Sequence, residues 1–374
     1  MAVTSRFAGS PTTRLARLAG RVSPDLTVGE WWVRWFPVVD LSPGTLEAYA
    51  QQYRRHVGPL FGHVRLDEVS SLDLSGFARS LTERGLAPSS VAVAMAVIRD
   101  LLEDAADAGL IAVAPSSRVR RRRAGQGQPV RAGIAVDLGT VVAIAQRLPA
   151  QESLMVVVAG FTGMRWGEVC GMRTTYLRLQ PPGLGVGGGV YEVDARFGAV
   201  HEDVHARRYF GPPKDGHGRT IDLPVFLADL LAERVEAVGG RPLLFANRRG
   251  EPIRNTDFGR LWRTACDGRL PRYARDGSVR APGTGPVYRG LRFQDLRHTH
   301  RTILADLGVA EALRNERLGH RPPGMGRIYE HPTLGMRKAM ADRLQALWET
   351  LRAGETRADG QRSQCGVTRY CQRL

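Results

Sequence analysis

Apolar residues recur three or four positions apart through residues 26–114, which is the spacing of helices with one buried face. Capping residues and helix formers mark where these helices begin. The predicted starts are Thr27, Ser42 with Pro43, Leu72, and Ser89 or Ser90, and Gly109 ends the last helix. These stripes together predict a compact helical domain over residues 26–114.

A second domain is predicted over residues 136–353. Helical spacing marks residues 141–148, 152–160, 163–172, 223–238 and most of the chain from 291 to 352. Residues 181–223 are rich in Gly and carry short β-branched and aromatic runs, which predict a small antiparallel sheet with tight turns. Residues 266–290 form a loop rich in Gly, Pro and Arg. The fold class is therefore mainly α, with a small antiparallel β-sheet in the second domain.

The charge balance points to a polyanionic partner. The chain has 374 residues with 53 Lys and Arg against 37 Asp and Glu, and its net charge is +16. Arginines that neutralise phosphates release counterions, so nucleic acid is favoured and an anionic membrane surface is the rival. No apolar run reaches the roughly 18–20 residues of a membrane span, and the N-terminus lacks a signal-peptide core. We therefore expect a cytoplasmic protein without a membrane segment.

Three further segments are polar. Residues 1–25 predict a flexible basic arm and residues 354–374 a disordered tail. Residues 115–135 have the composition of a linker between domains. This linker contains four consecutive arginines, Arg120, Arg121, Arg122 and Arg123. Such a run is usually a solvated tether, but between two DNA-binding domains it would follow the phosphate backbone, so we take these residues as candidate DNA contacts.

No cofactor or metal is indicated. The four cysteines form no Cys-x-x-Cys pair, and no histidine pair has zinc spacing. The Gly-x-x-x-x-Gly-Lys-Ser/Thr pattern of an ATP-binding loop is absent from the sequence. The candidate catalytic residues also lack a carboxylate cluster that would hold Mg²⁺.

Three short segments of the second domain carry the candidate chemistry. They are Thr162–Val169 (TGMRWGEV), Gln294–His300 (QDLRHTH), and Leu318–His320 (LGH) with Tyr329 nine residues later. Attack on a phosphodiester places negative charge on its non-bridging oxygens, and fixed cationic donors lower that barrier. Arginine suits this task because its planar fork binds two phosphate oxygens and keeps its charge. Arg165 and Arg297 are the candidate clamp. Glu168 lies on the same helical face as Arg165 and either orients it or only stabilises the helix start.

The order and spacing of these segments resemble the catalytic domain of the tyrosine recombinases, the phage integrase family. The resemblance covers roughly residues 26–350, since the helical domain stands where that family has its core-binding domain. It implies a two-domain recombinase of a phage or other mobile element that cleaves and rejoins DNA through a 3′-phosphotyrosine. Tyr329 would be the nucleophile, and His320 would donate a hydrogen bond to the scissile phosphate. A phosphotyrosine keeps the energy of the broken bond, so rejoining needs no ATP.

Lys214 is one of only two lysines in the chain. It lies in Gly211–Pro224, a segment that predicts a β-hairpin with a Gly-rich turn. The family carries a lysine on such a hairpin as general acid for the leaving 5′-oxygen. A lysine amine can release its proton, whereas an arginine cannot.

Gln294 departs from the family, whose second segment usually begins with histidine. Glutamine can donate a hydrogen bond to a phosphate but cannot carry a proton near neutral pH. We expect that another group or water handles the proton of Tyr329 and that the rate is lower. The alternative is a DNA-binding relative that has lost cleavage. A basic nucleic-acid-binding module with chance matches is a third hypothesis, which the joint spacing disfavours.

The resemblance also implies partners. These are double-stranded DNA, a homotetramer assembled on it, and a directionality factor as a further candidate. The amphipathic segment with Met340, Leu344 and Trp348 either docks on a neighbouring subunit or packs on its own domain. About 25 residues precede the helical domain, too few for an arm-binding domain. That favours a simple recombinase, a resolvase-like role, or a chain whose true start lies upstream.

Overall fold

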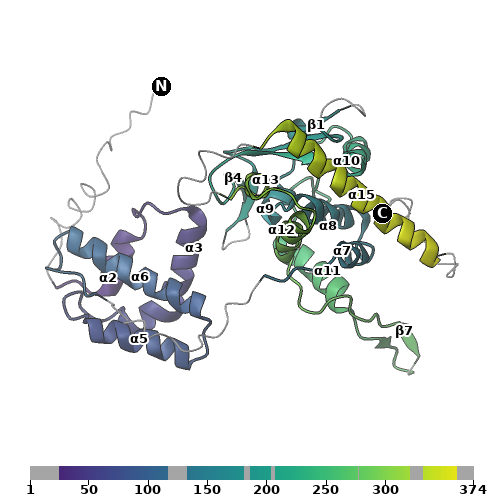
Figure 1. Cartoon of the computed structure of the whole chain (residues 1–374). Coiled ribbons are helices and arrows are strands. Elements are labelled where there is room, and N and C mark those ends of the chain that lie inside the picture. Colours follow the sequence, from purple (N-terminus) through teal and green to yellow (C-terminus); the bar gives the residue numbers. More distant parts are fainter. Residues whose placement is uncertain are drawn as a thin grey trace. The chain divides into compact units, whose positions relative to one another are not determined.

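The computed structural model describes residues 25–116, 133–180, 186–203, 207–276, 278–320 and 332–359. The chain divides into two compact units, Met1–Ala132 (unit 1) and Gly133–Leu374 (unit 2). Figure 1 shows unit 1 as helices alone and unit 2 as helices with small sheets, so the predicted class is confirmed. Four sequence predictions lie outside the described residues: most of the N-terminal arm, the linker arginines Arg120–Arg123, Tyr329 and the tail beyond residue 359. In the described ranges, no helix is long and apolar enough to cross a membrane.

Within residues 25–116, unit 1 consists of a short set of helices. They are α2 (Val28–Trp35), α3 (Pro43–Gln52), the π-helical turn η1 (Tyr53–Val57), α4 (Gly58–Phe61), α5 (Ser71–Glu83) and α6 (Pro88–Asp107). Thr27 forms a capping box with Glu30 at the start of α2, and Ser42 caps α3, as predicted. Trp31 is fully buried and its indole donates to the carbonyl of Leu101 at 3.0 Å, which ties α2 to α6.

The predicted serine cap of the last helix in unit 1 is wrong. Pro88 occupies the first turn of α6 and Ala87 is the N-cap residue, so Ser89 and Ser90 lie inside the helix. Proline favours this position because its φ is preset and the first amides need no partner within the helix. Gly109, with φ of 76°, follows the end of α6 as predicted.

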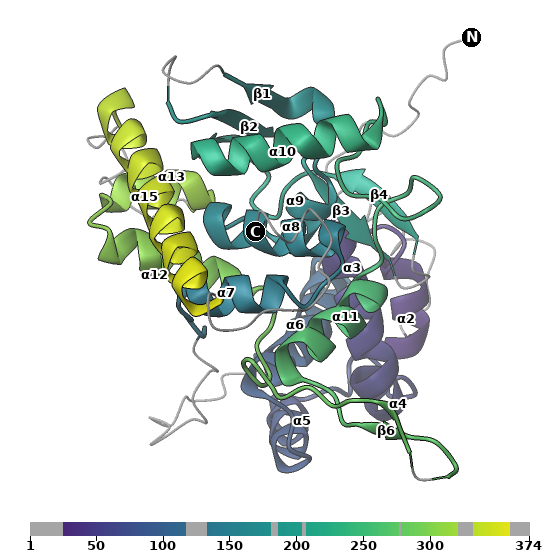
Figure 2. The ribbon, with the colours of Figure 1, turned by 90° about the vertical axis from the view of Figure 1, so that its right-hand side faces the viewer.

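Unit 2 is built around one central helix. Its described helices are α7 (Leu138–Ala145), α8 (Ala150–Thr162), α9 (Trp166–Cys170), the 3-10 turn η2 (Thr174–Tyr176), α10 (Val225–Val238), α11 (Asn255–Asp267), α12 (Asp295–Asp306), α13 (Glu311–Leu318) and α15 (Leu334–Asp359). Every residue of α8 from Ser153 to Thr162 is buried. A helix that is apolar all round belongs in a core, and α7, α9 and α12 pack against it (Figure 2).

Two small sheets are formed by the part of the chain between α9 and α10. Strands β1 (Leu177–Leu179), β2 (Gly189–Val193) and β5 (Arg219–Leu223) form one antiparallel sheet in the order β1-β2-β5. Strands β3 (Ala199–Glu202) and β4 (Arg208–Gly211) form the other.

The hairpin predicted around Lys214 is therefore wrong, because β4 and β5 belong to different sheets. Pro212 and Pro213 follow β4 directly, and neither has the amide N–H that would continue its ladder. The chain instead turns at Pro213–Gly216, where the Gly216 amide donates to the Pro213 carbonyl at 2.7 Å, and enters the next sheet.

The Gly-, Pro- and Arg-rich stretch between α11 and α12 also contains structure that its composition did not predict. Strands β6 (Arg272–Tyr273) and β7 (Val279–Ala281) pair antiparallel there. Figures 1 and 2 show this pair projecting beyond α11, away from α10 and α15.

Helix α15 packs on its own unit. Met340, Leu344 and Trp348 are buried in the core, and the Trp348 ring stacks on Phe226 of α10 with centroids 4.3 Å apart. Of the two alternatives for this apolar face, packing on its own domain is the one observed. The helix continues to Asp359, so the first residues of the segment predicted to be a disordered tail are helical.

Replacing Trp348 with alanine should destabilise the protein by about 3–5 kcal/mol, because it removes a large ring from the core and leaves a cavity. Leu334→Ala, at an exposed position of the same helix, is the matched control and should change stability by less than about 0.5 kcal/mol. Urea unfolding of the full chain measures both. Equal, small losses would contradict the packing of α15 on α10.

Candidate active site

The first and third sequence segments meet where two helices end. Helix α8 ends at Thr162 and α13 at Leu318, and each is followed by a glycine, Gly163 or Gly319, with φ of 69°. Glycine adopts this left-handed conformation without strain. A Cβ on Gly163 would lie 2.5 Å from a methyl carbon of Leu318. Glycine at this position therefore allows the two helix ends to approach each other.

Arg297 of α12 occupies the space between these helix ends. Its guanidinium donates to the carbonyl of Gly163 at 2.8 Å and to the carbonyl of Leu318. The same group lies 2.9 Å from Nε2 of His320. Burial and the neighbouring charge of Arg165 lower the pKa of Arg297 to about 9, which leaves it charged at neutral pH.

Arg165 stands at the start of α9. Its amide donates to Oε2 of Glu168 at 2.8 Å, and its guanidinium lies 3.4 Å from Oε1 of the same carboxylate. Both roles considered for Glu168 are therefore present, since it caps the helix and contacts the arginine. The guanidinium also pairs with Asp215 at 2.9 Å. Asp215 thus occupies a position next to Arg165 that an incoming anion would compete for.

Arg219 of β5 is a member of the cluster that the sequence did not reveal. It binds both carboxylate oxygens of the buried Glu168, at 2.9 and 2.7 Å, and donates to the carbonyl of Arg317 at 2.8 Å. Burial alone would raise the pKa of Glu168, but the hydrogen bonds and charge of Arg219, with the amide of Arg165, outweigh it and lower that pKa. Glu168 therefore stays ionised beneath the arginines.

Arg317, which directly precedes the Leu-Gly-His segment, was also missed. It is buried and donates to the carbonyls of Asp222 and Phe161, each at 2.9 Å, and to Nε2 of His300 at 3.0 Å. Because arginine only donates, Nε2 of His300 accepts, and Nδ1 carries the proton to the carbonyl of Gly160. Burial, followed by the charge of Arg317, holds the pKa of His300 well below its usual value. These contacts give His300 a structural role in the core.

His320 lies between two arginines of α12. Its Nε2 faces Arg297 at 2.9 Å and its Nδ1 faces Arg301 at 3.0 Å. A neutral imidazole has only one accepting nitrogen, so the ring cannot accept from both guanidinium groups. Burial, Arg297, Arg301 and then Arg165 lower the pKa of His320 to about 4, against the opposite effect of Asp215. The ring is neutral at physiological pH, with one N–H directed at an arginine donor.

The remaining predicted site residues differ in how the structure places them. Lys214 is exposed between β4 and β5, next to the Asp215 that pairs with Arg165, so its loop reaches the arginines. Gln294 is the exposed N-cap residue of α12. Neither side chain hydrogen-bonds to another residue in the described part of the chain, and Tyr329 lies outside that part.

Metal-ligating side chains do not gather in the described ranges: no group of three or more His, Cys, Asp or Glu could hold an ion there. The two cysteines in these ranges, Cys170 and Cys266, are buried free thiols. Burial raises the pKa of the Cys266 thiol to about 12, which makes it a poor nucleophile.

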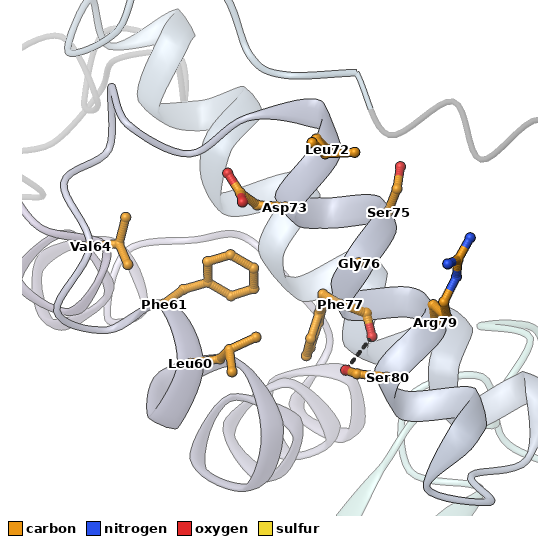
Figure 3. A pocket seen from close by; sticks show the side chains of 10 residues that line it. All are labelled: Leu60, Phe61, Val64, Leu72, Asp73, Ser75, Gly76, Phe77, Arg79 and Ser80. Carbon is orange, nitrogen blue, oxygen red and sulfur yellow. Dashed lines mark hydrogen bonds between the residues drawn. The ribbon is translucent and has the colours of Figure 1, made fainter.

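Unit 1 contains a cavity of a different chemical character. Its volume is about 630 Å³, and it lies between α4 and α5 (Figure 3). Leu60 and Phe61 face α5 across it, and polar side chains such as Asp73 and Arg79 stand on α5. It lacks the convergent donors that Arg165 and Arg297 supply in unit 2, so we assign it no part in catalysis.

Comparison with known sequences identifies both units. Residues 137–335 match the phage integrase family, and residues 27–82 match the phage integrase N-terminal SAM-like domain. The integrase of Mycobacterium phage L5 is 23% identical over 327 residues, which cover 87% of this chain and 80% of that protein. These matches confirm the resemblance that the three sequence segments indicated.

Solved structures share the fold. The Tn1549 transposon integrase in complex with transposon right end DNA is similar with a TM-score of 0.59 and 17% identity, covering 85% of this chain and 99% of that one. A lambda integrase tetramer bound to a Holliday junction is similar with a TM-score of 0.52 and 15% identity, covering 89% of this chain and 86% of that one.

Replacing Arg219 with glutamine should destabilise unit 2 by about 3–5 kcal/mol, because Glu168 would keep a buried charge without its two-point partner. The loss should be smaller at pH 5 than at pH 8, since the pKa of the unpaired carboxyl rises and protonation then removes the buried charge. Urea unfolding at both pH values measures this.

Arg178→Gln is the control for this change. Arg178 lies on the same sheet but forms an exposed ion pair with Glu192, so its loss should cost less than about 1 kcal/mol. Similar losses in the two variants would show that the Arg219–Glu168 pair does not support the site.

Arg301→Ala should raise the pKa of His320 from about 4 toward its ordinary value, because one of the charges facing the ring is removed while Asp215 remains. At pH 5 a larger fraction of the His320 ring would then be protonated than in the wild type. NMR of ring-labelled histidine against pH measures it. Arg343→Ala removes the same charge from α15, where it contacts the carbonyl of Leu307, and should leave His320 unchanged. An unaltered titration in Arg301→Ala would contradict the assigned cause.

Proposed function

Because the chain belongs to the phage integrase family, we propose that it is a site-specific DNA recombinase that cleaves and rejoins duplex DNA through a 3′-phosphotyrosine. The observation that carries the proposal is the convergence of Arg165, Arg297 and His320 at the ends of α8 and α13. Three potential donors gathered at these helix ends suit the non-bridging oxygens of a phosphodiester, on which charge grows during attack. An integrase of a phage or other mobile element is the biological role that fits this activity.

In the proposed reaction, Oη of Tyr329 attacks the phosphorus, the Tyr–O–P bond forms and the bond from phosphorus to the 5′-oxygen breaks. Arg165 and Arg297 neutralise the charge on the non-bridging oxygens. The ring N–H of His320, which faces a guanidinium donor, turns to a phosphate oxygen and so loses this unfavourable contact. The reverse attack by a 5′-hydroxyl rejoins the strand.

Lys214 is proposed as the general acid that protonates the leaving 5′-oxygen. Support comes from its loop, since the adjacent Asp215 already contacts Arg165. When a phosphate displaces Asp215 from Arg165, the loop is free to move its lysine toward the reacting oxygens. Gln294 is proposed to hydrogen-bond the phosphate, so that the proton of Tyr329 leaves to water or another group.

The proposed partners follow from the same activity. Unit 1 would serve as core-binding domain and unit 2 as catalytic domain on double-stranded DNA in the cytoplasm, with Arg120–Arg123 along the backbone between them. We propose a homotetramer as the active assembly, in line with the tetramer that lambda integrase forms on a Holliday junction. A directionality factor remains a candidate further partner.

The direct test uses a nicked duplex that carries the candidate attachment site and traps the covalent intermediate. The wild-type chain should form an adduct that survives a denaturing gel, and Tyr329→Phe should form none. Tyr176→Phe, at a partly buried tyrosine in η2 outside the site, is the matched control and should keep the adduct. An adduct that persists in Tyr329→Phe would exclude this residue as the nucleophile.

Gln294 supports one alternative, a DNA-binding relative without cleavage activity. Wild-type protein that binds the duplex but forms no adduct would favour it. Gln294→His then decides where the defect lies, since restored cleavage would assign it to the missing proton carrier. In an active wild type, the same substitution should raise the cleavage rate.

A further inference from the structure

A two-stranded arm leaves unit 2 between α11 and α12. It spans residues 269–289 and contains β6 and β7, which project beyond α11 (Figures 1 and 2). Backbone hydrogen bonds between Arg269 and Thr284, at 2.9 and 3.0 Å, pair its two strands before β6 begins. The arm is therefore an ordered ribbon and not an open loop.

The base of the arm is fixed to the core. The guanidinium of Arg147 donates to the carbonyl of Gly285 at 2.6 Å and to the carbonyl of Ala265 at 3.3 Å. The amide of Val287 donates to the carbonyl of Cys266 at 2.9 Å. These bonds join the returning end of the arm to the turn after α7 and to the end of α11, so the arm leaves the unit in a defined direction.

The arm carries a concentrated positive charge. Its five arginines are all exposed: Arg269, Arg272, Arg275, Arg280 and Arg289. Its one acidic residue is Asp276, so the 21 residues have a net charge of +4 (five minus one). Asp276 accepts hydrogen bonds from the amide and hydroxyl of Ser278 at 2.9 and 2.6 Å, which places it in the turn. Within the described ranges, none of the five arginines forms an ion pair.

Apolar side chains on the arm are also uncovered. Leu270 is 87% exposed, and Tyr273 and Val279, which are partners in the strand register, are 62% and 59% exposed. An exposed strand pair with apolar side chains needs a partner surface. The partner must also accept several positive charges, and this combination disfavours an ordinary protein interface, whose centre is depleted in charge.

We propose that this arm is a DNA-binding ribbon that lies in a groove of the duplex and contacts phosphates through Arg272, Arg275 and Arg280. The major groove of B-DNA is about 12 Å wide and admits a two-stranded β-ribbon. Arginines near the rims of the ribbon reach the phosphates, and apolar side chains such as Tyr273 meet base edges and thymine methyl groups. The proposal rests on the proposed recombinase function and adds a contact separate from the reacting phosphate.

The test measures how duplex affinity depends on salt, using the full chain and a fluorescent duplex. The triple variant Arg272→Gln, Arg275→Gln, Arg280→Gln should bind more weakly. The slope of log affinity against log salt should fall in magnitude by about 2–3, at about 0.9 for each phosphate that the variant no longer neutralises. Arg241→Gln, Arg248→Gln, Arg249→Gln removes the same charge from exposed positions of unit 2 and should keep the wild-type slope. All six side chains are exposed, so both variants should fold, and urea unfolding checks this.

Four outcomes would overturn the proposal. An unchanged slope in the arm variant, while wild type binds the duplex and forms the adduct, would contradict the arm alone. An equal decrease of the slope in both triple variants would attribute the effect to the total charge of the protein and not to the arm. A wild-type protein that binds no duplex would contradict the recombinase function together with the arm. Sedimentation of the double variant Leu270→Ser, Tyr273→Ser tests whether the apolar side chains of the arm form a protein interface. If this variant dissociates a DNA-free oligomer, and the arginine variant keeps the wild-type slope, the arm belongs to a protein interface.

Discussion

The free carbonyl groups at the carboxyl ends of α8 and α13 accept hydrogen bonds from three arginines of the candidate site. The last carbonyls of a helix have no partner within it and carry its partial negative charge, so they suit cations. Carbonyls of this kind accept from Arg297, Arg317 and Arg219. Neutral carbonyls, rather than carboxylates, thus satisfy Arg297 and Arg317. Their positive charge is held in place by neutral dipoles and is not paired with a carboxylate.

This arrangement explains the state of the groups around it. Glu168 is buried and paired with Arg219, so its charge supports the floor of the cluster. Asp215, in contrast, lies in the exposed turn between β4 and β5. His320 has a guanidinium donor at each ring nitrogen, and burial together with these charges lowers its pKa. A phosphate in the place of Asp215 would accept hydrogen bonds from Arg165 and from the ring N–H of His320. It would balance the charge of Arg165 and replace the unfavourable contact between the ring N–H and a guanidinium donor.

Local patterns were enough for part of this picture. Caps and apolar spacing located most of the helices, but they missed α11 and misplaced the start of α6. The three segments named Arg165, Arg297 and His320, because those residues follow short motifs. Arg219 and Arg301 could not be found in this way. Arginine is the commonest charge in the chain, and only the tertiary contact with Glu168 or His320 distinguishes these two. Long-range pairing also decided the strands, since a residue pattern around Lys214 fits a hairpin as well as a crossover between sheets.

Titration of the full chain with inorganic phosphate, observed at the ring nitrogens of labelled histidine, tests the central claim most directly. If the helix ends hold uncancelled guanidinium charge at one position, the His320 signals should move saturably. The pKa of that ring should also rise, because the bound anion accepts a hydrogen bond from the ring N–H and its charge stabilises the protonated ring. Arg297→Lys should weaken the response, since lysine lacks the planar fork that the carbonyls of Gly163 and Leu318 hold. No movement at His320, with shifts only at exposed histidines, would contradict a preformed anion site at these helix ends.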